Sequence, residues 1–213
     1  MENNTNRPQN PEEWGKIYQE KLALYEGFAN KLHELITELM HKYDIEVAHI
    51  EARTKSVGSF MEKIGREGKD YSNPLDDITD LVGIRVITYY REDVEKVGKI
   101  INEEFDIDWR NSVDLSQTLK PDTFGYLSIH YVISLLDTRS ELPEWESHKN
   151  IKAEVQVRTV LQHAWAEIEH TLLYKTQQEI PNDLKRRLFR LSALLELADE
   201  QFSAIQRTLK INK

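Results

Sequence analysis

Residues 76–87 read DDITDLVGIRVI, where three carboxylates precede an apolar run typical of a buried strand, and Arg85 lies in the middle of that run. A charged side chain inside an apolar strand is costly unless another group compensates it. Arg85 must therefore have a structural partner or bind a ligand. Asp80, at the start of the strand, is the second charged residue whose role this segment leaves open.

On both sides of this segment the apolar residues follow the period of two that is typical of strands, with helical stretches between them. Strands are predicted at Glu46–Lys55, Gly83–Tyr90, Tyr126–Ser134 and Ile151–Thr159. Helices are predicted at Ser56–Arg66, Arg91–Glu104 and Val160–Lys175, and loops at Asp106–Pro121 and Thr138–Asn150. Helices interspersed with a central sheet indicate an α/β or α+β fold.

Two long helices flank this region, at residues 12–43 and 181–210, and each repeats an apolar residue every three or four positions. Such a stripe packs on the core of its own chain or forms a seam between chains of an oligomer. We expect the first helix to pack on the core, and both alternatives stay open for the last. The sequence further predicts a disordered tail at 1–11 and a single domain at 12–213.

The composition excludes several classes of protein. Charged residues make up 31% of the 213 residues and the formal net charge is −9, which argues against a protein that coats nucleic acid. There is no cysteine, so disulfides and thiolate metal sites are excluded. No apolar run is long enough to span a membrane, and the polar N-terminus lacks the pattern of a signal peptide. These features predict a cytoplasmic protein.

Two of the predicted strands have a polar face with an unusual mixture of side chains. One face of the strand at 126–134 carries Tyr126, Ser128 and His130. One face of the strand at 151–159 carries Lys152, Glu154, Gln156 and Arg158. A sheet with one solvated side explains such alternation, but so does a binding site built from aromatic, imidazole, carboxylate, amide and guanidinium groups.

The segment at 53–66, RTKSVGSFMEKIGR, places cations on one face of a helix. Lys55, Ser59, Lys63 and Arg66 recur at steps of four, four and three. A basic surface helix explains the row, and a bound polyphosphate explains it as well. Beside a polyphosphate, Mg²⁺ uses one or two carboxylates, and Asp80 and Glu154 are the candidates if their strands are neighbours. Arg85 would then stack on a base or bind phosphate.

Other motifs for phosphate or metal binding are absent or weak. Neither a GxxxxGK[ST] loop nor a GxGxxG motif occurs in the chain. His163, Glu167 and His170 share one helix face that could bind a metal, although a helix that covers the sheet explains this face better.

The blocks DDITDLVGIRV, TFGYLSIHYV and KAEVQVRTVLQHAWAEIEHTLLYK, together with the basic segment, resemble the synthetase domain of the RelA/SpoT family over about residues 45–175. The short chain is similar to the small stand-alone alarmone synthetases. The resemblance implies a mixed central β-sheet flanked by helices, as in nucleotidyltransferases. It implies Mg²⁺-dependent transfer of pyrophosphate from ATP to the 3′-hydroxyl of GDP or GTP, which forms (p)ppGpp and releases AMP.

The same resemblance assigns roles to residues of this chain. ATP would be bound by Arg53 and Arg85, which enclose the adenine, and by Lys55, Ser59, Lys63 and Arg66 on the phosphates. Asp80 and Glu154 would bind the metal, Glu154 would also accept the proton of the attacking hydroxyl, and Gln156 would steady that arrangement. The acceptor would be bound by Lys120, Tyr126, His130, Arg158, His163 and Glu169.

One departure from the family pattern and two rival functions remain. Many members have arginine after the stacking tyrosine, where this chain has Leu127. A toxic relative would instead pyrophosphorylate the 3′ end of tRNA or make adenosine alarmones, and the basic cluster at 185–190 is the sequence feature in favour of tRNA. An inactive nucleotide-binding scaffold that forms a homo-oligomer through its long helices is the other alternative.

Overall fold

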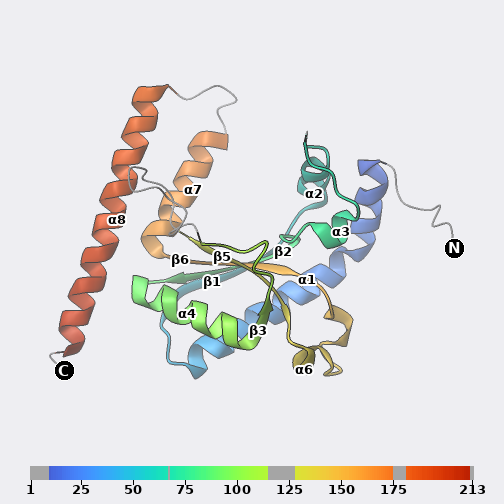
Figure 1. The fold of residues 1–213 in the computed structure, drawn as a ribbon, viewed down its shortest axis with the longest axis horizontal. Coiled ribbons are helices and arrows are strands. Elements are labelled where there is room, and N and C mark those ends of the chain that lie inside the picture. Colours follow the sequence, from blue (N-terminus) through green and yellow to red (C-terminus); the bar gives the residue numbers. More distant parts are fainter. Residues whose placement is uncertain (1–9, 67, 115–127, 175–180, 212–213) are drawn as a thin grey trace.

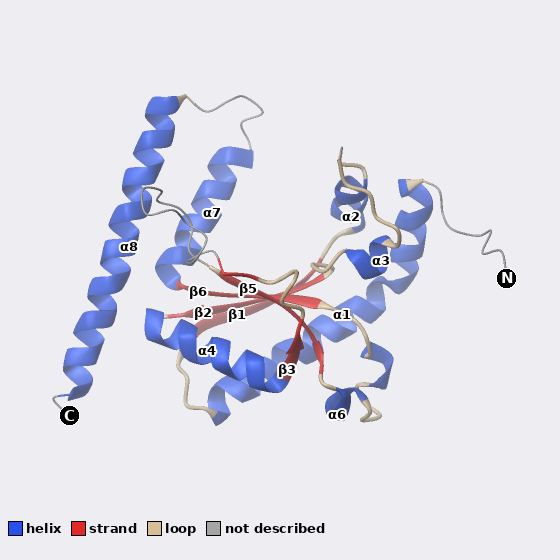
Figure 2. Ribbon diagram, viewed as in Figure 1, coloured by secondary structure: helices blue, strands red, loops and turns tan. Residues whose placement is uncertain are grey.

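The computed structural model describes residues 10–66, 68–114, 128–174 and 181–211. Figure 1 shows a central sheet with helices on both sides, and Figure 2 distinguishes helices from strands. The helices are α1 (Pro11–Lys42), α2 (Val57–Ile64), α3 (Pro74–Asp77), α4 (Arg91–Glu104), α6 (Asp137–Ser140), the 3-10 turn η1 (Glu146–His148), α7 (Val160–Tyr174) and α8 (Asn182–Ile211). The strands are β1 (Val47–Thr54), β2 (Val82–Thr88), β3 (Phe105–Ile107), β4 (Val113–Asp114), β5 (Ile129–Leu135) and β6 (Ala153–Thr159).

All of these strands form one sheet in the order β1-β2-β6-β5-β3, and β4 also pairs with β5. β2 and β6 run parallel, whereas β1–β2, β5–β6, β3–β5 and β4–β5 are antiparallel. The predicted fold class, a mixed sheet flanked by helices, is therefore confirmed. The four predicted strands correspond to β1, β2, β5 and β6.

α1 and α4 cover one face of the sheet and form the core (Figure 1). Leu32 and Ile36 of α1 have no exposed surface and belong to one hydrophobic cluster with Ile84 and Val155 of the sheet. A buried side chain of this size contributes about 1.5–3 kcal/mol to stability. The prediction that the first long helix packs on the core is confirmed.

The start of α1 has a clear local cause. The side chain of Asn10 accepts a hydrogen bond of 2.8 Å from the backbone nitrogen of Glu13, and Pro11 occupies the first turn. Most of the predicted disordered tail at 1–11 lies outside the described residues, and the single domain at 12–213 stays a prediction.

α8 is oriented in the opposite way, with its polar side toward the protein. Ser192, Asp199 and Ser203 are buried, whereas Leu194 is 62% exposed and Phe202 is 54% exposed. The interpretation that α8 packs an apolar stripe on the core is therefore wrong, and only the oligomer seam remains as a prediction. No helix within the described ranges is long and apolar enough to cross a membrane.

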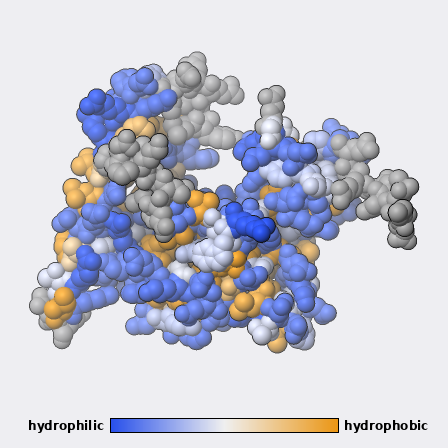
Figure 3. Space-filling view, in the orientation of Figure 1, coloured by the Kyte–Doolittle hydropathy of each residue, from blue (hydrophilic) through white to orange (hydrophobic). Residues whose placement is uncertain are grey.

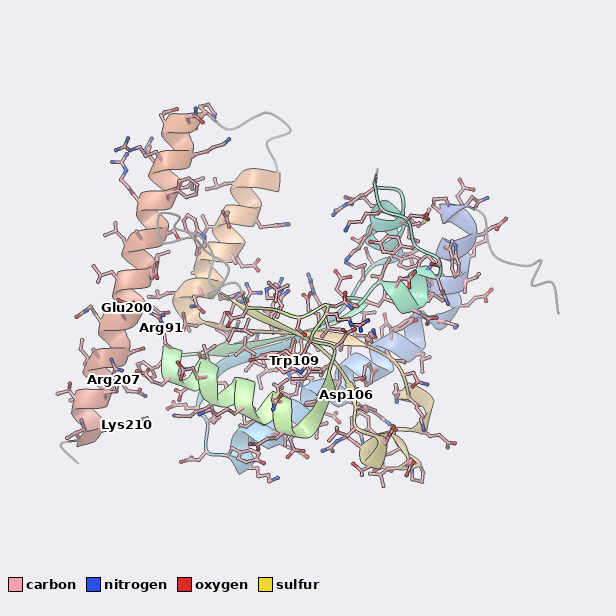
Figure 4. The ribbon with its side chains drawn as sticks, in the orientation of Figure 1. Arg91, Asp106, Trp109, Glu200, Arg207 and Lys210 are labelled. Carbon is pink, nitrogen blue, oxygen red and sulfur yellow. The ribbon has the colours of Figure 1, made fainter. Side chains whose placement is uncertain are left out.

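Polar contacts attach α8 to the rest of the fold. Thr159 Oγ1 donates a hydrogen bond of 2.8 Å to Asp199 Oδ2, and the backbone nitrogen of Arg91 donates one of 3.2 Å to Ser203 Oγ. Arg91 Nη1 lies 2.7 Å from Glu200 Oε1, and Figure 4 shows these two side chains side by side. Burial raises the pKa of the Asp199 carboxyl, so this attachment includes a charged group that is costly to bury.

Two segments predicted as loops contain regular structure. β3 and β4 lie at or within the segment 106–121, and α6 and η1 lie at or within 138–150. Strands of two or three residues are too short to produce a detectable period. They form because β5 offers an edge with free backbone groups, which is a property of the folded sheet.

The contact between α4 and β5 yields a stability prediction. A methyl group at Gly98 would lie 2.5 Å from Tyr131 Oη, whereas a methyl group at Gly58 of α2 would meet nothing within 4 Å. We expect Gly98→Ala to lower the free energy of unfolding by about 1–3 kcal/mol through overpacking. Gly58→Ala should raise it by about 0.5–1 kcal/mol because alanine favours the helix.

Chemical denaturation measures both changes. The matched control introduces Gly98→Ala into a Tyr131→Phe variant, which lacks the clashing hydroxyl. In that background Gly98→Ala should lower the free energy of unfolding only slightly. An equal cost of Gly98→Ala with and without the hydroxyl would contradict this account of the contact.

Candidate active site

The polar faces of β1, β2, β6 and β5 lie on one side of the sheet, opposite the core. In the register, Arg53 is opposite Gly83 and Gly83 is opposite Glu154. The next row of partners on the same face is Glu51, Arg85, Gln156 and His130. Cross-strand partners point to the same face of a sheet, so these side chains form one polar surface. α2 and α7 rise at its two ends, and Figure 3 shows the surface hollowed between them.

Asp80 lies between two lysines at one end of this surface. Its Oδ1 is 2.8 Å from Lys63 Nζ, and its Oδ2 is 3.0 Å from Lys55 Nζ. The exposed fractions of the side chains are 18% for Asp80, 14% for Lys55 and 28% for Lys63. Burial raises the pKa of the Asp80 carboxyl, but the two ammonium groups outweigh burial and hold the pKa below its usual value.

Local structure positions both lysines. The backbone nitrogen of Lys55 donates to Leu81 O at 2.9 Å, and Tyr18 Oη donates to Lys55 O at 2.7 Å. Ser56 caps α2 by accepting a hydrogen bond from the backbone nitrogen of Ser59 at 3.2 Å. The cap starts the helix that places Lys63 over Asp80.

The rest of the predicted cation row is less closely gathered. Ser59 Oγ accepts a hydrogen bond of 3.0 Å from Ser56 Oγ at the cap. Arg66 Nη2 lies 3.1 Å from Glu62 Oε1, and both of these side chains are more than half exposed. Two members of the row therefore contact Asp80, whereas Ser59 and Arg66 have other partners.

The guanidinium inside strand β2 has two structural partners. Arg85 Nη1 lies 3.2 Å from Glu51 Oε2 on β1 and 3.1 Å from Glu167 Oε1 on α7. Burial raises the pKa of Glu51, but Arg85 and His49 outweigh it and keep the pKa lowered. These carboxylates compensate the charge of Arg85, which is 21% exposed.

Glu51 and Glu167 were not among the site residues predicted from the sequence. The alternation of Glu51 with Arg53 was a usable signal, because it places Glu51 on the polar face. Glu167 lies on the helix face considered for a metal, and it contacts Arg85. The link between these residues and Arg85 depends on strand order and on the position of α7.

Glu154 has supporting groups on both sides. Gln156 Nε2 donates a hydrogen bond of 2.6 Å to its Oε1, and His130 Nδ1 lies 3.8 Å from the same oxygen. Arg158, which is buried, donates in turn to Gln156 Oε1. Burial raises the pKa of Glu154, but His130 and Gln156 outweigh it, so the net pKa is lowered.

The remaining predicted acceptor residues are only partly placed. Burial lowers the pKa of His163 on α7, and the positive charge of Arg158 acts in the same direction. Burial raises the pKa of Glu169 on the same helix. Lys120 and Tyr126, as well as Leu127, lie outside the described residues.

Asp80 and Glu154 are the two carboxylates that the sequence predicts to bind a divalent cation. Asp80 precedes β2 by two residues, and Glu154 pairs with Gly83 on the neighbouring strand. The negative charge of Asp80 is close enough to act on the pKa of Glu154. Among the described residues, no group of three or more His, Cys, Asp or Glu side chains is arranged to hold a metal ion. Two carboxylates are enough for Mg²⁺ when phosphate oxygens and water complete its shell.

Comparison with known proteins identifies the family of the chain. A model of the family described as "Region found in RelA / SpoT proteins" matches residues 52–179, more than half of the chain. The chain therefore belongs to the RelA/SpoT family.

Two curated relatives come from Bacillus subtilis. The chain is 25% identical to GTP pyrophosphokinase YwaC over 197 residues, which cover 89% of this chain and 90% of the relative. It is 28% identical to GTP pyrophosphokinase YjbM over 199 residues, which cover 90% and 89%.

Solved structures of small alarmone synthetase 1 from Bacillus subtilis have the same fold. One matches with a TM-score of 0.73 at 25% identity and covers 92% of this chain and 98% of that one. The structure bound to its product pppGpp has a TM-score of 0.72 at 26% identity, with coverages of 91% and 98%. The structure bound to AMPCPP has a TM-score of 0.67 at 25% identity, with coverages of 92% and 98%.

The environment of Glu154 predicts a measurable change in its pKa. His130→Ala removes a group that favours the carboxylate, so the pKa of Glu154 should rise toward and above its usual value. Gln156→Leu should shift it in the same direction, whereas the control His41→Ala on the exposed side of α1 should leave it unchanged. Carboxyl-resolved NMR titration measures these values. An unchanged or lower pKa of Glu154 in both site variants would contradict the assigned cause.

Proposed function

We propose that this protein is a Mg²⁺-dependent pyrophosphokinase that transfers the β,γ-pyrophosphoryl group of ATP to the 3′-hydroxyl of GDP or GTP and releases AMP. The observation that carries the proposal is the cluster of Lys55, Asp80 and Lys63 at the start of β2, the strand whose Gly83 pairs with Glu154. This arrangement offers cations for phosphates and two carboxylates for a metal. Membership of the RelA/SpoT family and the names of the curated relatives support it. The cytoplasmic location stays a prediction.

ATP would lie across β1 and β2. The side chain of Arg53 passes over Gly83, where a methyl group would lie only 3.1 Å from Arg53 Nε. Arg85 lies in the next row of the same face, and the two guanidinium groups would stack on the adenine. Lys55 and Lys63 would bind the phosphates, with Ser59 and Arg66 farther along the row. The complex of a similar synthetase with AMPCPP supports a nucleotide at this site.

In the reaction, the acceptor's 3′ oxygen forms a bond to the β-phosphorus while the bond from that phosphorus to the bridging α,β-oxygen breaks. Glu154 accepts the proton of the attacking hydroxyl, and its hydrogen bond with Gln156 holds the carboxylate in place. The lysines neutralise charge on the transferred group. A bound Mg²⁺, held by Asp80 and Glu154, would neutralise further charge on the phosphates.

The acceptor would lie toward β5 and α7. His130 and Arg158 share the polar face with Glu154, and the positive charge of Arg158 acts on the pKa of His163. These residues, together with Glu169, Lys120 and Tyr126, would bind the guanine nucleotide. The product pppGpp in a similar synthetase supports a guanosine acceptor. The assay described below distinguishes GDP from GTP as the acceptor.

Loss of either carboxylate should abolish turnover. We expect Asp80→Ala and Glu154→Ala each to reduce AMP release by about 10³-fold or more with Mg²⁺, ATP and GDP, because positioning and charge neutralisation supply most of the acceleration. Glu38→Ala, an exposed carboxylate on α1, serves as the control. Circular dichroism checks folding, and normal turnover in either folded site variant refutes the assignment.

The same assay separates the rival functions. Labelled ATP is incubated with GDP, GTP, an adenosine nucleotide or tRNA, and the products are identified by chromatography. A guanosine product supports the proposal, whereas labelled tRNA or an adenosine product assigns the protein to the toxic relatives. Tight ATP binding without AMP formation identifies an inactive nucleotide-binding protein.

The exposed face of α8 supports a homo-oligomer. Leu191, Phe202, Ile205 and Leu209 are each more than half exposed, and Figure 3 shows apolar surface along this helix. The polar side of α8 already contacts β6 and α4 of its own chain, so its apolar side is the face that a second copy would cover. The occupant of this face is therefore a second copy of the chain.

Light scattering coupled to gel filtration tests the seam. Wild-type protein should elute as an oligomer, and Phe202→Glu should shift it toward the monomer because a charge in an apolar seam is costly. Gln201→Glu adds the same charge to a neighbouring polar position and should have little effect. A monomeric wild-type protein contradicts the seam.

A further inference from the structure

The pair of lysines at Asp80 has a consequence for the order in which ligands bind. Each carboxylate oxygen of Asp80 contacts one ammonium group, at 2.8 Å from Lys63 and 3.0 Å from Lys55. These groups are the ones that the proposed function assigns to the metal and to the phosphates. In the structure, however, they bind one another, so the carboxylate takes the place of a phosphate group between the lysines.

We infer that Asp80 is a resting counter-ion for Lys55 and Lys63, and that it becomes available to a divalent cation only after a nucleoside polyphosphate has taken over both lysines. The inference deepens the proposed function and rests on it. It concerns the regulation of the same site: free metal is excluded, and the polyphosphate opens the position that the metal needs.

Electrostatics explains the exclusion of free metal. A divalent cation that approaches Asp80 meets two ammonium groups within 3.0 Å of the carboxylate oxygens, in surroundings where each of the three side chains is less than a third exposed. Repulsion between these cations is only weakly screened at a partly buried site. Breaking one contact frees only one oxygen of Asp80, because the second lysine still occupies the other.

The structure also explains how the partners are exchanged. The lysine backbones are fixed by the Lys55–Leu81 hydrogen bond and by the start of α2, whereas the ammonium groups lie at the ends of flexible stems with three donors each. A triphosphate has several oxygens and more negative charge than one carboxylate. It can therefore bind both ammonium groups without a change in the backbone and leave both oxygens of Asp80 unoccupied.

The exchange predicts an unexpected effect of losing Asp80. Without metal, Asp80 competes with the phosphates for the lysines, so its removal should strengthen metal-free ATP binding while it abolishes turnover. We expect Asp80→Asn to bind ATP about tenfold more tightly than wild type in EDTA, by isothermal titration calorimetry. Glu154→Gln removes the same charge from a residue that contacts Gln156 and His130, and should change the affinity much less.

Metal binding without nucleotide provides a second, independent measurement. The electron paramagnetic resonance signal of free Mn²⁺ should show weak binding to wild-type protein. Lys63→Met leaves one oxygen of Asp80 without its ammonium group, so Mn²⁺ affinity should rise about tenfold. Asp80→Asn added to Lys63→Met should cancel the gain. Lys63→Arg retains the cation, and Lys99→Met removes an exposed lysine from α4; both should resemble wild type.

The outcomes distinguish this inference from the proposed function. Equal effects of Asp80→Asn and Glu154→Gln on metal-free ATP affinity, or equal Mn²⁺ affinity of wild type and Lys63→Met, overturn the inference even if the enzyme turns over normally. Failure of wild-type protein to form AMP from ATP and any acceptor overturns the proposed function. The gain in Mn²⁺ affinity would then still show that Lys63 competes with a divalent cation for Asp80.

Discussion

The parallel pairing of β2 with β6 is the constraint on which the site depends. In this register Gly83 is opposite Glu154 and Arg85 is opposite Gln156. Side chains alternate along a strand, so a shift of one residue would turn Arg85 or Glu154 into the core, where α1 and α4 pack. The apolar partners on the opposite face, such as Ile84 and Val155, stabilise this register by their burial. The core therefore sets the relative positions of the charged groups, although it contributes none of them.

Charge compensation is the second feature of the site. Arg85 lies between Glu51 and Glu167, and Asp80 lies between Lys55 and Lys63, so neither buried charge depends on a ligand for its stability. Such pairs keep the polar face ordered before a nucleotide binds. A nucleotide or metal that binds must therefore replace these ion pairs. Its affinity consequently depends on the strength of the contacts inside the protein.

The two long helices illustrate how one pattern has two structural outcomes. Both repeat apolar residues at spacings of three and four, yet α1 buries its stripe and α8 exposes its own. α8 is attached through Asp199, Ser203 and Glu200, which are polar contacts to β6 and α4. Within the described residues, α8 therefore leaves most of its large apolar side chains exposed.

By itself the sequence determined the strands β1, β2, β5 and β6, the polar face of each strand and the core position of α1, because periodicity reports which face of an element is buried. It also indicated the cation row and the two carboxylates as a group. The tertiary structure alone decided that Lys55 and Lys63 meet at Asp80, that Glu51 and Glu167 meet at Arg85, and that α8 turns its apolar side outward. The strands β3 and β4 likewise depend on the edge of β5. Periodicity describes one element at a time, whereas each of these contacts depends on strand order, on register and on how distant segments of the chain pack together.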